Sequence, residues 1–179
     1  TYPCAHVIQP FLDTAIAARA EENLTADSIT QVTCTLAPWA LPIVAEPRAP
    51  KLRPAGPLEA IASLPFMVAA ALLDGRVDLD TISPESLERP DVLALAGRVE
   101  HEADKGLGQG FDGRLEIEAR RRRRYEVRAQ AAEPAQLREK FRRNAGRNFE
   151  TAAVTAVENA VDDLAGGGFD PLWRACGRP

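Results

Sequence analysis

The stretch from Ala62 to Arg76, ASLPFMVAAALLDGR, constrains the fold more than any other part of the sequence. Apolar residues recur there at helical spacing and predict one buried face: Leu64, Met67, Val68, Ala71 and Leu72. The opposite face is small and apolar as well, with Ala69 and Ala70, so neighbouring elements are expected to cover this helix on more than one side. Gly75 is expected to end it, because glycine readily adopts the left-handed conformation at a helix terminus.

Three runs alternate between apolar and polar residues, as expected of half-buried strands. The first is SITQVTCTL at residues 28–36, and the other two cover residues 115–119 and 125–129. The second and third runs are close enough in sequence to pair as a hairpin. The arginines at 120–124 lie between them, and we interpret these as a solvated tip balanced by the surrounding glutamates.

The remaining segments favour helices and loops. Helices are expected over residues 8–19, after the Ser83-Pro84 pair, from Pro90 onward, and again after residue 134 until the glycines at 166–168. Val99 fits the helical stripe that begins at Pro90, but it also fits a strand face shared with His101 and Ala103. Residues 37–57 contain many of the 14 prolines and predict an irregular loop.

This order of elements predicts an α+β fold. A small antiparallel sheet packed with helices is expected over residues 1–132, followed by a helical segment over residues 133–179.

Composition excludes several classes of function. A net charge of −4, and an arginine run without a wider basic face or an aromatic stacking surface, argue against a nucleic-acid-binding domain. No apolar run reaches the length of about 18 residues that a membrane helix needs. The three cysteines (Cys4, Cys34 and Cys176) are far apart and odd in number, so they predict neither a metal site nor a disulfide framework, and a reducing cytoplasm is the simplest compartment.

Three stretches in register resemble one enzyme family. YPCAHVIQPFLDTAI at the start, SLPFMVAAALLDGRV in the middle and LREKFRRNA toward the end are similar to the carboxyl-terminal part of the MmgE/PrpD (2-methylcitrate dehydratase) family. The resemblance implies a smaller α+β lid domain, whose last helices return to pack on a large all-helical domain that supplies most of the active-site residues. It also implies homodimers, no metal or organic cofactor, and an active site in the cleft between the domains.

The resemblance directs attention to a few side chains, and the chemistry explains why. Enzymes that remove a proton next to a carboxylate need a proton carrier with a suitable pKa, and histidine is the natural carrier near neutral pH. His6 lies in the Tyr-Pro-Cys stretch, where family members often place a histidine near the cleft, so it is the predicted catalytic residue. Gln9 lies where relatives often have a second histidine, and it is a predicted hydrogen-bonding contact to substrate. The competing interpretation is that His6 only packs or caps at a helix start.

Three further residues are candidates for substrate binding. Lys51 and Arg53 precede the central helix and could meet a substrate carboxylate, although basic residues in loops are more often solvated. Ser63 begins the Ser-Leu-Pro sequence that resembles the family's, but most of this helix is expected to be lid core.

The leading hypothesis is therefore the carboxyl-terminal lid of a cofactor-independent lyase that acts on small di- or tricarboxylates and needs the all-helical domain for activity. Dehydration, decarboxylation and epimerisation all remain open. The alternative is a stand-alone α+β binding module, whose helices around residues 141 and 157 would expose an apolar face that needs a partner.

Overall fold

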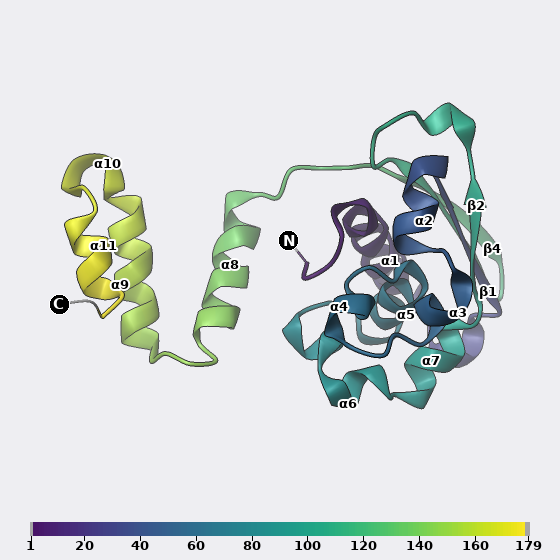
Figure 1. The fold of residues 1–179 in the computed structure, drawn as a ribbon, viewed down its shortest axis with the longest axis horizontal. Coiled ribbons are helices and arrows are strands. Elements are labelled where there is room, and N and C mark those ends of the chain that lie inside the picture. Colours follow the sequence, from purple (N-terminus) through teal and green to yellow (C-terminus); the bar gives the residue numbers. More distant parts are fainter. Residues whose placement is uncertain (1, 178–179) are drawn as a thin grey trace. The chain divides into compact units, whose positions relative to one another are not determined.

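The computed structural model describes residues 2–177, apart from the side chain of Ala165, and divides them into two compact units (Figure 1). The larger unit covers residues 2–130 and contains every strand of the described chain. The smaller unit covers residues 131–177 and is helical. The fold is α+β, as predicted.

A four-stranded sheet forms one layer of the larger unit. Its strands, in spatial order, are β2 (Val99–Ala103), β1 (Gln31–Leu36), β3 (Gly113–Glu118) and β4 (Arg122–Val127). The predicted hairpin is confirmed, because β3 and β4 pair antiparallel with Leu115 opposite Tyr125. The sheet is mixed, however, because β1 pairs antiparallel with β3 but parallel with β2. Val99 thus belongs to a strand, where it pairs with Val32, and the helical interpretation of Val99 is wrong.

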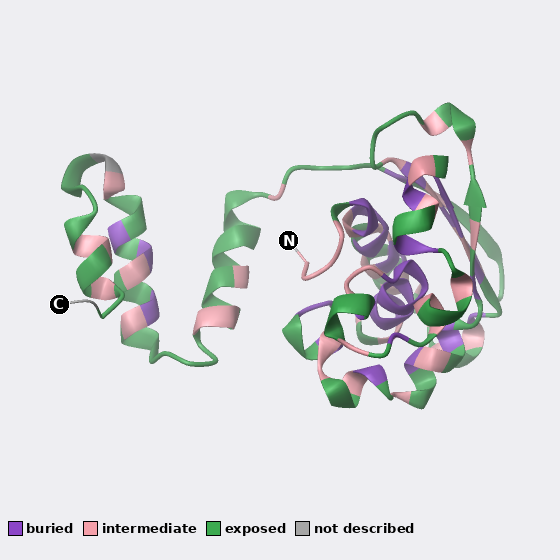
Figure 2. Cartoon of the chain, in the orientation of Figure 1, coloured by how far each residue is buried: buried purple, intermediate pink, exposed green. Residues whose placement is uncertain are grey.

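The helices α1 (Gln9–Glu22) and α5 (Leu64–Asp74) lie on one side of the sheet and carry much of the core (Figures 1 and 2). All residues from Leu64 to Leu72 are buried, and α5 packs against both α1 and α7 (Pro90–Ala96). This confirms that the central helix is covered on more than one side. Gly75 ends α5 with φ +67°, and its N–H bonds the Ala71 carbonyl, as expected of a left-handed cap.

The expectation of an irregular loop at residues 37–57 is wrong in part. The segment contains a 3-10 turn and the short helices α2 and α3, and α4 begins at its end. Their bounds are Pro38–Ala40, Leu41–Val44, Arg48–Leu52 and Pro57–Ala60. Proline explains the difference, since Pro38, Pro42 and Pro57 occupy first-turn positions, where a missing N–H costs no helical hydrogen bond.

Short helical segments complete the larger unit. They are the 3-10 turns His6–Ile8, Ala26–Ser28, Leu79–Ile82 and Lys105–Leu107, and helix α6 (Pro84–Leu87). Ser83 caps α6 as predicted, because its Oγ accepts the N–H of Ser86 at 3.2 Å.

The smaller unit consists of α8 (Pro134–Ala145), α9 (Thr151–Asp162), α10 (Leu164–Gly167) and α11 (Asp170–Ala175). Helix α9 ends at Asp162, before the glycines that were expected to end it, and Gly166 and Gly167 belong to the separate turn α10. Arg142 on α8 bonds Glu158 on α9 at 2.9 Å, and Arg138 pairs with Asp162 between the same helices.

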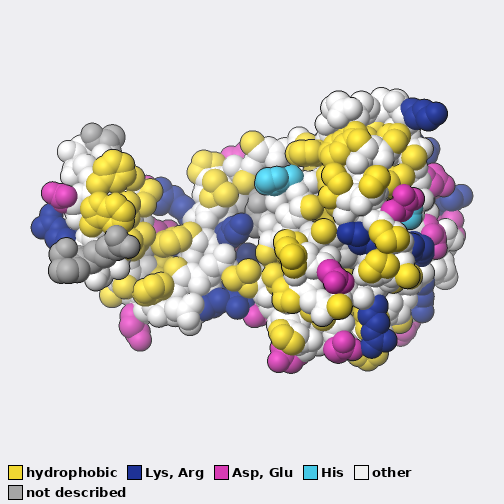
Figure 3. All heavy atoms as spheres, viewed as in Figure 1, with side chains coloured by type: hydrophobic (Ala, Val, Ile, Leu, Met, Phe, Trp, Pro, Cys, Tyr) yellow, Lys and Arg dark blue, Asp and Glu magenta, His cyan; other side chains and the backbone are white. Residues whose placement is uncertain are grey.

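Large apolar side chains remain on the surface of this unit, as Figure 3 shows for the helices near the carboxyl end. They are Leu137, Phe141, Phe149, Val161, Phe169 and Trp173, with Phe169 64% exposed. Phe141 belongs to the apolar face that a stand-alone module was expected to expose around residues 141 and 157, whereas Val157 is only partly exposed.

Candidate active site

The candidate site lies where the amino-terminal segment meets the turn before α5. The N–H of Ala5 donates to the carbonyl of Ile61 at 2.8 Å, so residues separated by more than 50 positions form one surface. His6 begins the 3-10 turn that leads directly into α1, and Gln9 is the first residue of α1. The structure therefore places His6 beside the turn that contains Ala62 and Ser63.

The side chain of His6 is accessible at this place. Its imidazole is exposed, whereas Val7 and Ile8, which follow it, are buried in the core. Within residues 2–177 the imidazole makes no hydrogen bond or ion pair. An exposed and unpaired imidazole is accessible to a substrate and could serve as a general acid or base. The catalytic role of His6 stays a prediction, as does the competing interpretation that it only packs or caps at a helix start.

Gln9 is half-buried and partly engaged. Its Nε2 lies 3.5 Å from the carbonyl oxygen of Tyr2, which is a long hydrogen bond. Tyr2 is itself anchored, because its Oη donates to Oδ1 of Asp13 at 2.7 Å. Together these bonds tie the segment before His6 to the first turns of α1.

Lys51 has a structural role in this surface. Its Nζ donates to the carbonyls of Ile43 and Ala62, each at 2.7 Å, and so joins α2 to the turn before α5. Partial burial lowers the pKa of the Lys51 ammonium, and the nearby carboxylate of Glu59 opposes this shift. An ammonium has three donors, so one N–H of Lys51 remains after these two bonds.

Ser63 is buried and caps α5. Its Oγ accepts the N–H of Phe66 at 3.2 Å and donates to the carbonyl of Lys51. The side chain is 0% exposed, so this burial does not support a direct contact with substrate. The sequence could have indicated the capping role, because Ser before Leu-Pro is a typical helix start.

Arg53 is directed to another partner. Its guanidinium bonds Glu88 at 2.8 Å, and both side chains are 68% exposed. The structure therefore joins Lys51 and Ser63 at the turn before α5, and the Ala5–Ile61 bond ties this turn to the segment that carries His6. Arg53 forms a separate surface ion pair. Such pairs break easily, because exposed ion pairs contribute little free energy.

Other features of the described residues bear on the class of chemistry. No cluster of three or more His, Cys, Asp or Glu within residues 2–177 has the geometry to hold a metal ion. None of the three cysteines forms a disulfide, and Cys34 is buried whereas Cys176 is exposed. Over the same residues, no helix is both long and apolar enough to span a membrane.

The sequence model of the MmgE/PrpD C-terminal domain matches residues 2–165, which is most of the chain. The chain belongs to the MmgE/PrpD family. This is a family of 2-methylcitrate dehydratase-like lyases, and a C-terminal domain of this kind implies association with the family's N-terminal domain. The match includes His6, all of the larger unit, and helices α8 and α9 of the smaller unit, whereas helix α11 lies beyond it. A search of curated proteins finds no match.

Proposed function

We propose that this MmgE/PrpD domain is the lid of a cofactor-independent lyase that removes water from a small tricarboxylate of the 2-methylcitrate type. An all-helical N-terminal domain completes the active site. The observation that carries the proposal is the exposed, unpaired imidazole of His6 on a surface that the family match includes. The cytoplasmic location and the homodimer stay predictions within this proposal.

The reaction assigns a simple task to His6. Dehydration breaks a C–H bond next to a carboxylate, breaks the C–O bond on the neighbouring carbon and forms a C=C bond. One proton leaves carbon, and the departing hydroxide needs a proton to become water. His6 performs one of these transfers as a general acid or base, and a group on the N-terminal domain performs the other.

Substrate carboxylates need donors around the proton carrier. The remaining N–H of Lys51 and the amide of Gln9 are the donors proposed to meet these carboxylates, and Arg53 is the candidate for a carboxylate that approaches from the side of Glu88. Ser63 contributes by holding Lys51 through its carbonyl and by fixing the start of α5.

The exposed apolar residues of the smaller unit support the need for a second domain. Leu137, Phe149 and Trp173 are each at least half exposed, and an all-helical partner with a complementary apolar surface would bury them. We propose that this surface is where the N-terminal domain packs.

The test combines the chain with the all-helical domain of a family member and follows the ultraviolet absorbance of the unsaturated product from 2-methylcitrate. His6→Gln removes the proton carrier but keeps hydrogen bonding, and it is expected to lower kcat by about 100-fold. His101→Gln is the matched control, because His101 lies in β2 beside Glu46 and is not part of the His6 surface.

Two results would contradict the proposal. Full activity of His6→Gln would remove His6 from the chemistry. A stable monomer that ignores the helical domain would instead favour the alternative, a binding module without catalytic activity.

A further inference from the structure

A hollow of about 460 Å³ lies in the larger unit at the carboxyl end of α1, far from His6. Its charged and polar lining comes from α1 and from the β3–β4 hairpin, and includes Glu22, Asn23, Arg120, Arg121, Arg123 and Tyr125. Helix α1 separates this hollow from Gln9 by 14 residues, or about 20 Å at the helical rise. The hollow is therefore separate from the candidate active site.

The arginine run divides between the two faces of the sheet. Side chains alternate along a strand, so Arg122 and Arg124 point to the face opposite to that of the buried Val127. On that face they pair with Glu116 at 3.1 and 2.9 Å. Arg123 and Tyr125 share the face of Val127, which is the face that α1 covers.

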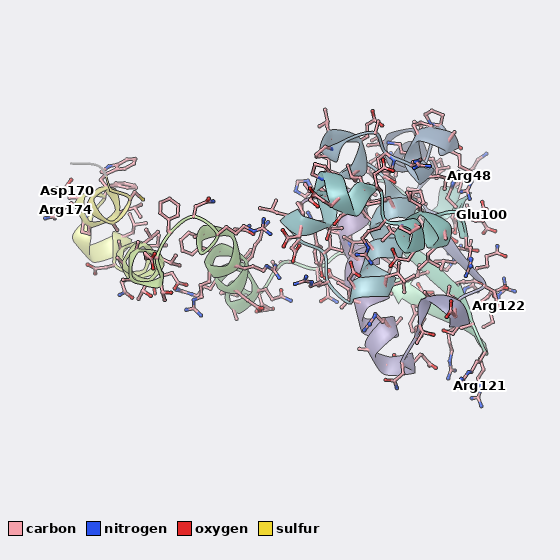
Figure 4. All side chains as sticks on the ribbon, turned by 90° about the horizontal axis from the view of Figure 1, so that it is seen from below. Arg48, Glu100, Arg121, Arg122, Asp170 and Arg174 are labelled. Carbon is pink, nitrogen blue, oxygen red and sulfur yellow. The ribbon has the colours of Figure 1, made fainter. Side chains whose placement is uncertain are left out.

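The hollow keeps an excess of positive charge. Arg123 pairs with Glu22 at 2.9 Å, so these two charges offset each other. Arg120 and Arg121 form no ion pair with any residue that the structure describes. Figure 4 shows Arg121 at the end of the hairpin, apart from Arg122. Among the residues that line the hollow, three guanidinium groups and one carboxylate give a net charge of two positive units.

Tyr125 supplies an unused donor in the same place. Its Oη is buried and has no hydrogen-bond partner among the described residues. Burial, together with the carboxylates of Glu22 and Glu21, raises the pKa of the phenol, so the hydroxyl stays protonated at neutral pH. Buried hydroxyls without a partner are uncommon, because the lost hydration costs free energy.

We propose that this hollow binds a small dianion, either a phosphate group or a compact dicarboxylate, through Arg120, Arg121 and the Tyr125 hydroxyl. Guanidinium groups bind both kinds of anion in a bidentate manner. The two unpaired charges match a dianion, and the phenol donates to one of its oxygens. The proposal does not depend on the role of His6, and it makes the hairpin end a ligand site rather than a solvated tip.

The test titrates the full chain with inorganic phosphate and, separately, with succinate, and follows the backbone amide shifts of residues 119–125 by NMR. The probe that produces saturable shifts identifies the source of the dianion. Arg120→Ala/Arg121→Ala is expected to weaken binding by about 10-fold or more, and Tyr125→Phe by about 5-fold, since hydrogen bonds to charged groups are the strong ones. Arg122→Ala/Arg124→Ala is the matched control, which removes the same charge from the opposite face and is expected to change the affinity by less than about twofold.

Two outcomes would overturn the proposal. If both double variants weaken binding equally, the anion responds to general surface charge and not to this hollow. If neither probe shifts the amides of residues 119–125 in a saturable way, the hollow is not a dianion site. Tyr125→Phe keeps the ring that packs against the core, so its result remains interpretable if an arginine variant folds poorly.

Discussion

The Ser63 hydroxyl is expected to stabilise the larger unit through two hydrogen bonds that no other side chain replaces. Ser63→Ala leaves the Phe66 N–H without its cap, which costs about 1 kcal/mol of unfolding free energy. It also removes the donor to the Lys51 carbonyl, which costs about 1 kcal/mol more at a site that is 0% exposed. The sum, about 2 kcal/mol, corresponds to a fall in Tm of about 6–10 °C for a unit of this size.

The assay follows tryptophan fluorescence during thermal unfolding in a Trp173→Phe background, so that Trp39 reports on the larger unit alone. Ser83→Ala is the matched control, because Ser83 caps a helix of only four residues and is partly exposed. It is expected to lower Tm by less than half as much. If Ser63→Ala and Ser83→Ala have the same Tm, or if Ser63→Ala has the Tm of the parent, the buried Ser63 hydroxyl does not contribute the stability assigned to it.

Three further predictions follow from contacts elsewhere in the two units. Gly113→Ala is expected to lower the free energy of unfolding, measured in urea, by about 1–3 kcal/mol. The added Cβ would lie 2.5 Å from the Thr35 carbonyl oxygen and 2.6 Å from the Phe11 ring. Gly110→Ala, whose added Cβ would lie 3.9 Å from its nearest atom, is the control. Arg142→Ala is expected to destabilise the smaller unit by about 1–2 kcal/mol, because Glu158 is 8% exposed and would lose its partner. Unfolding is followed by Trp173 fluorescence in a Trp39→Phe background, with Arg143→Ala as the control. An unchanged unfolding transition in Arg142→Ala would contradict the prediction. The Ala129 N–H and then Arg128 hold the pKa of Asp112 below its ordinary value. The Asp112 carboxylate therefore stabilises the fold at pH values above the unfolded pKa near 4, and this stabilisation is lost as pH falls through the folded pKa. Asp112→Asn should be less stable than the parent at neutral pH and equally stable in strong acid.

The helices and the hairpin could be predicted because local pattern and tertiary environment agree there. The apolar residues of α5 from Leu64 to Leu72 are all buried, and the glycine after it adopts the expected left-handed conformation. Strand β2 was harder, because Val-Glu-His-Glu-Ala carries only one residue that is buried. Its position is fixed by parallel pairing with β1, a contact between distant parts of the chain that no local pattern encodes.

Only some contacts of the candidate site could be predicted from the sequence, because only some of them join residues that are close in the chain. The capping bond of Ser63 joins residues three apart, so sequence is enough to find it. The bonds of Lys51 reach Ile43 and Ala62, which lie 8 and 11 residues away, and only the folded turn reveals them. The arginine run could have been divided by strand parity, since Arg122 and Arg124 alternate with Arg121 and Arg123. The hollow beside the arginine run could not be predicted in this way, because it forms only where the end of α1 meets the hairpin.

The two ends of α1 give the larger unit two different surfaces. At the amino end, one uncompensated imidazole lies on a backbone fixed by the Ala5–Ile61 bond, which suits the transfer of a single proton. At the carboxyl end, two uncompensated guanidinium groups and a buried hydroxyl suit the binding of an anion without chemistry. Because α1 packs on both α5 and the hairpin strands, a ligand bound at the hairpin end would act on the helix that follows the His6 turn. Phosphate or succinate bound in the hollow should then change kcat or KM of the completed enzyme, although the hollow is not the site where the substrate binds. Arg120→Ala/Arg121→Ala should abolish that response while leaving the basal rate unchanged.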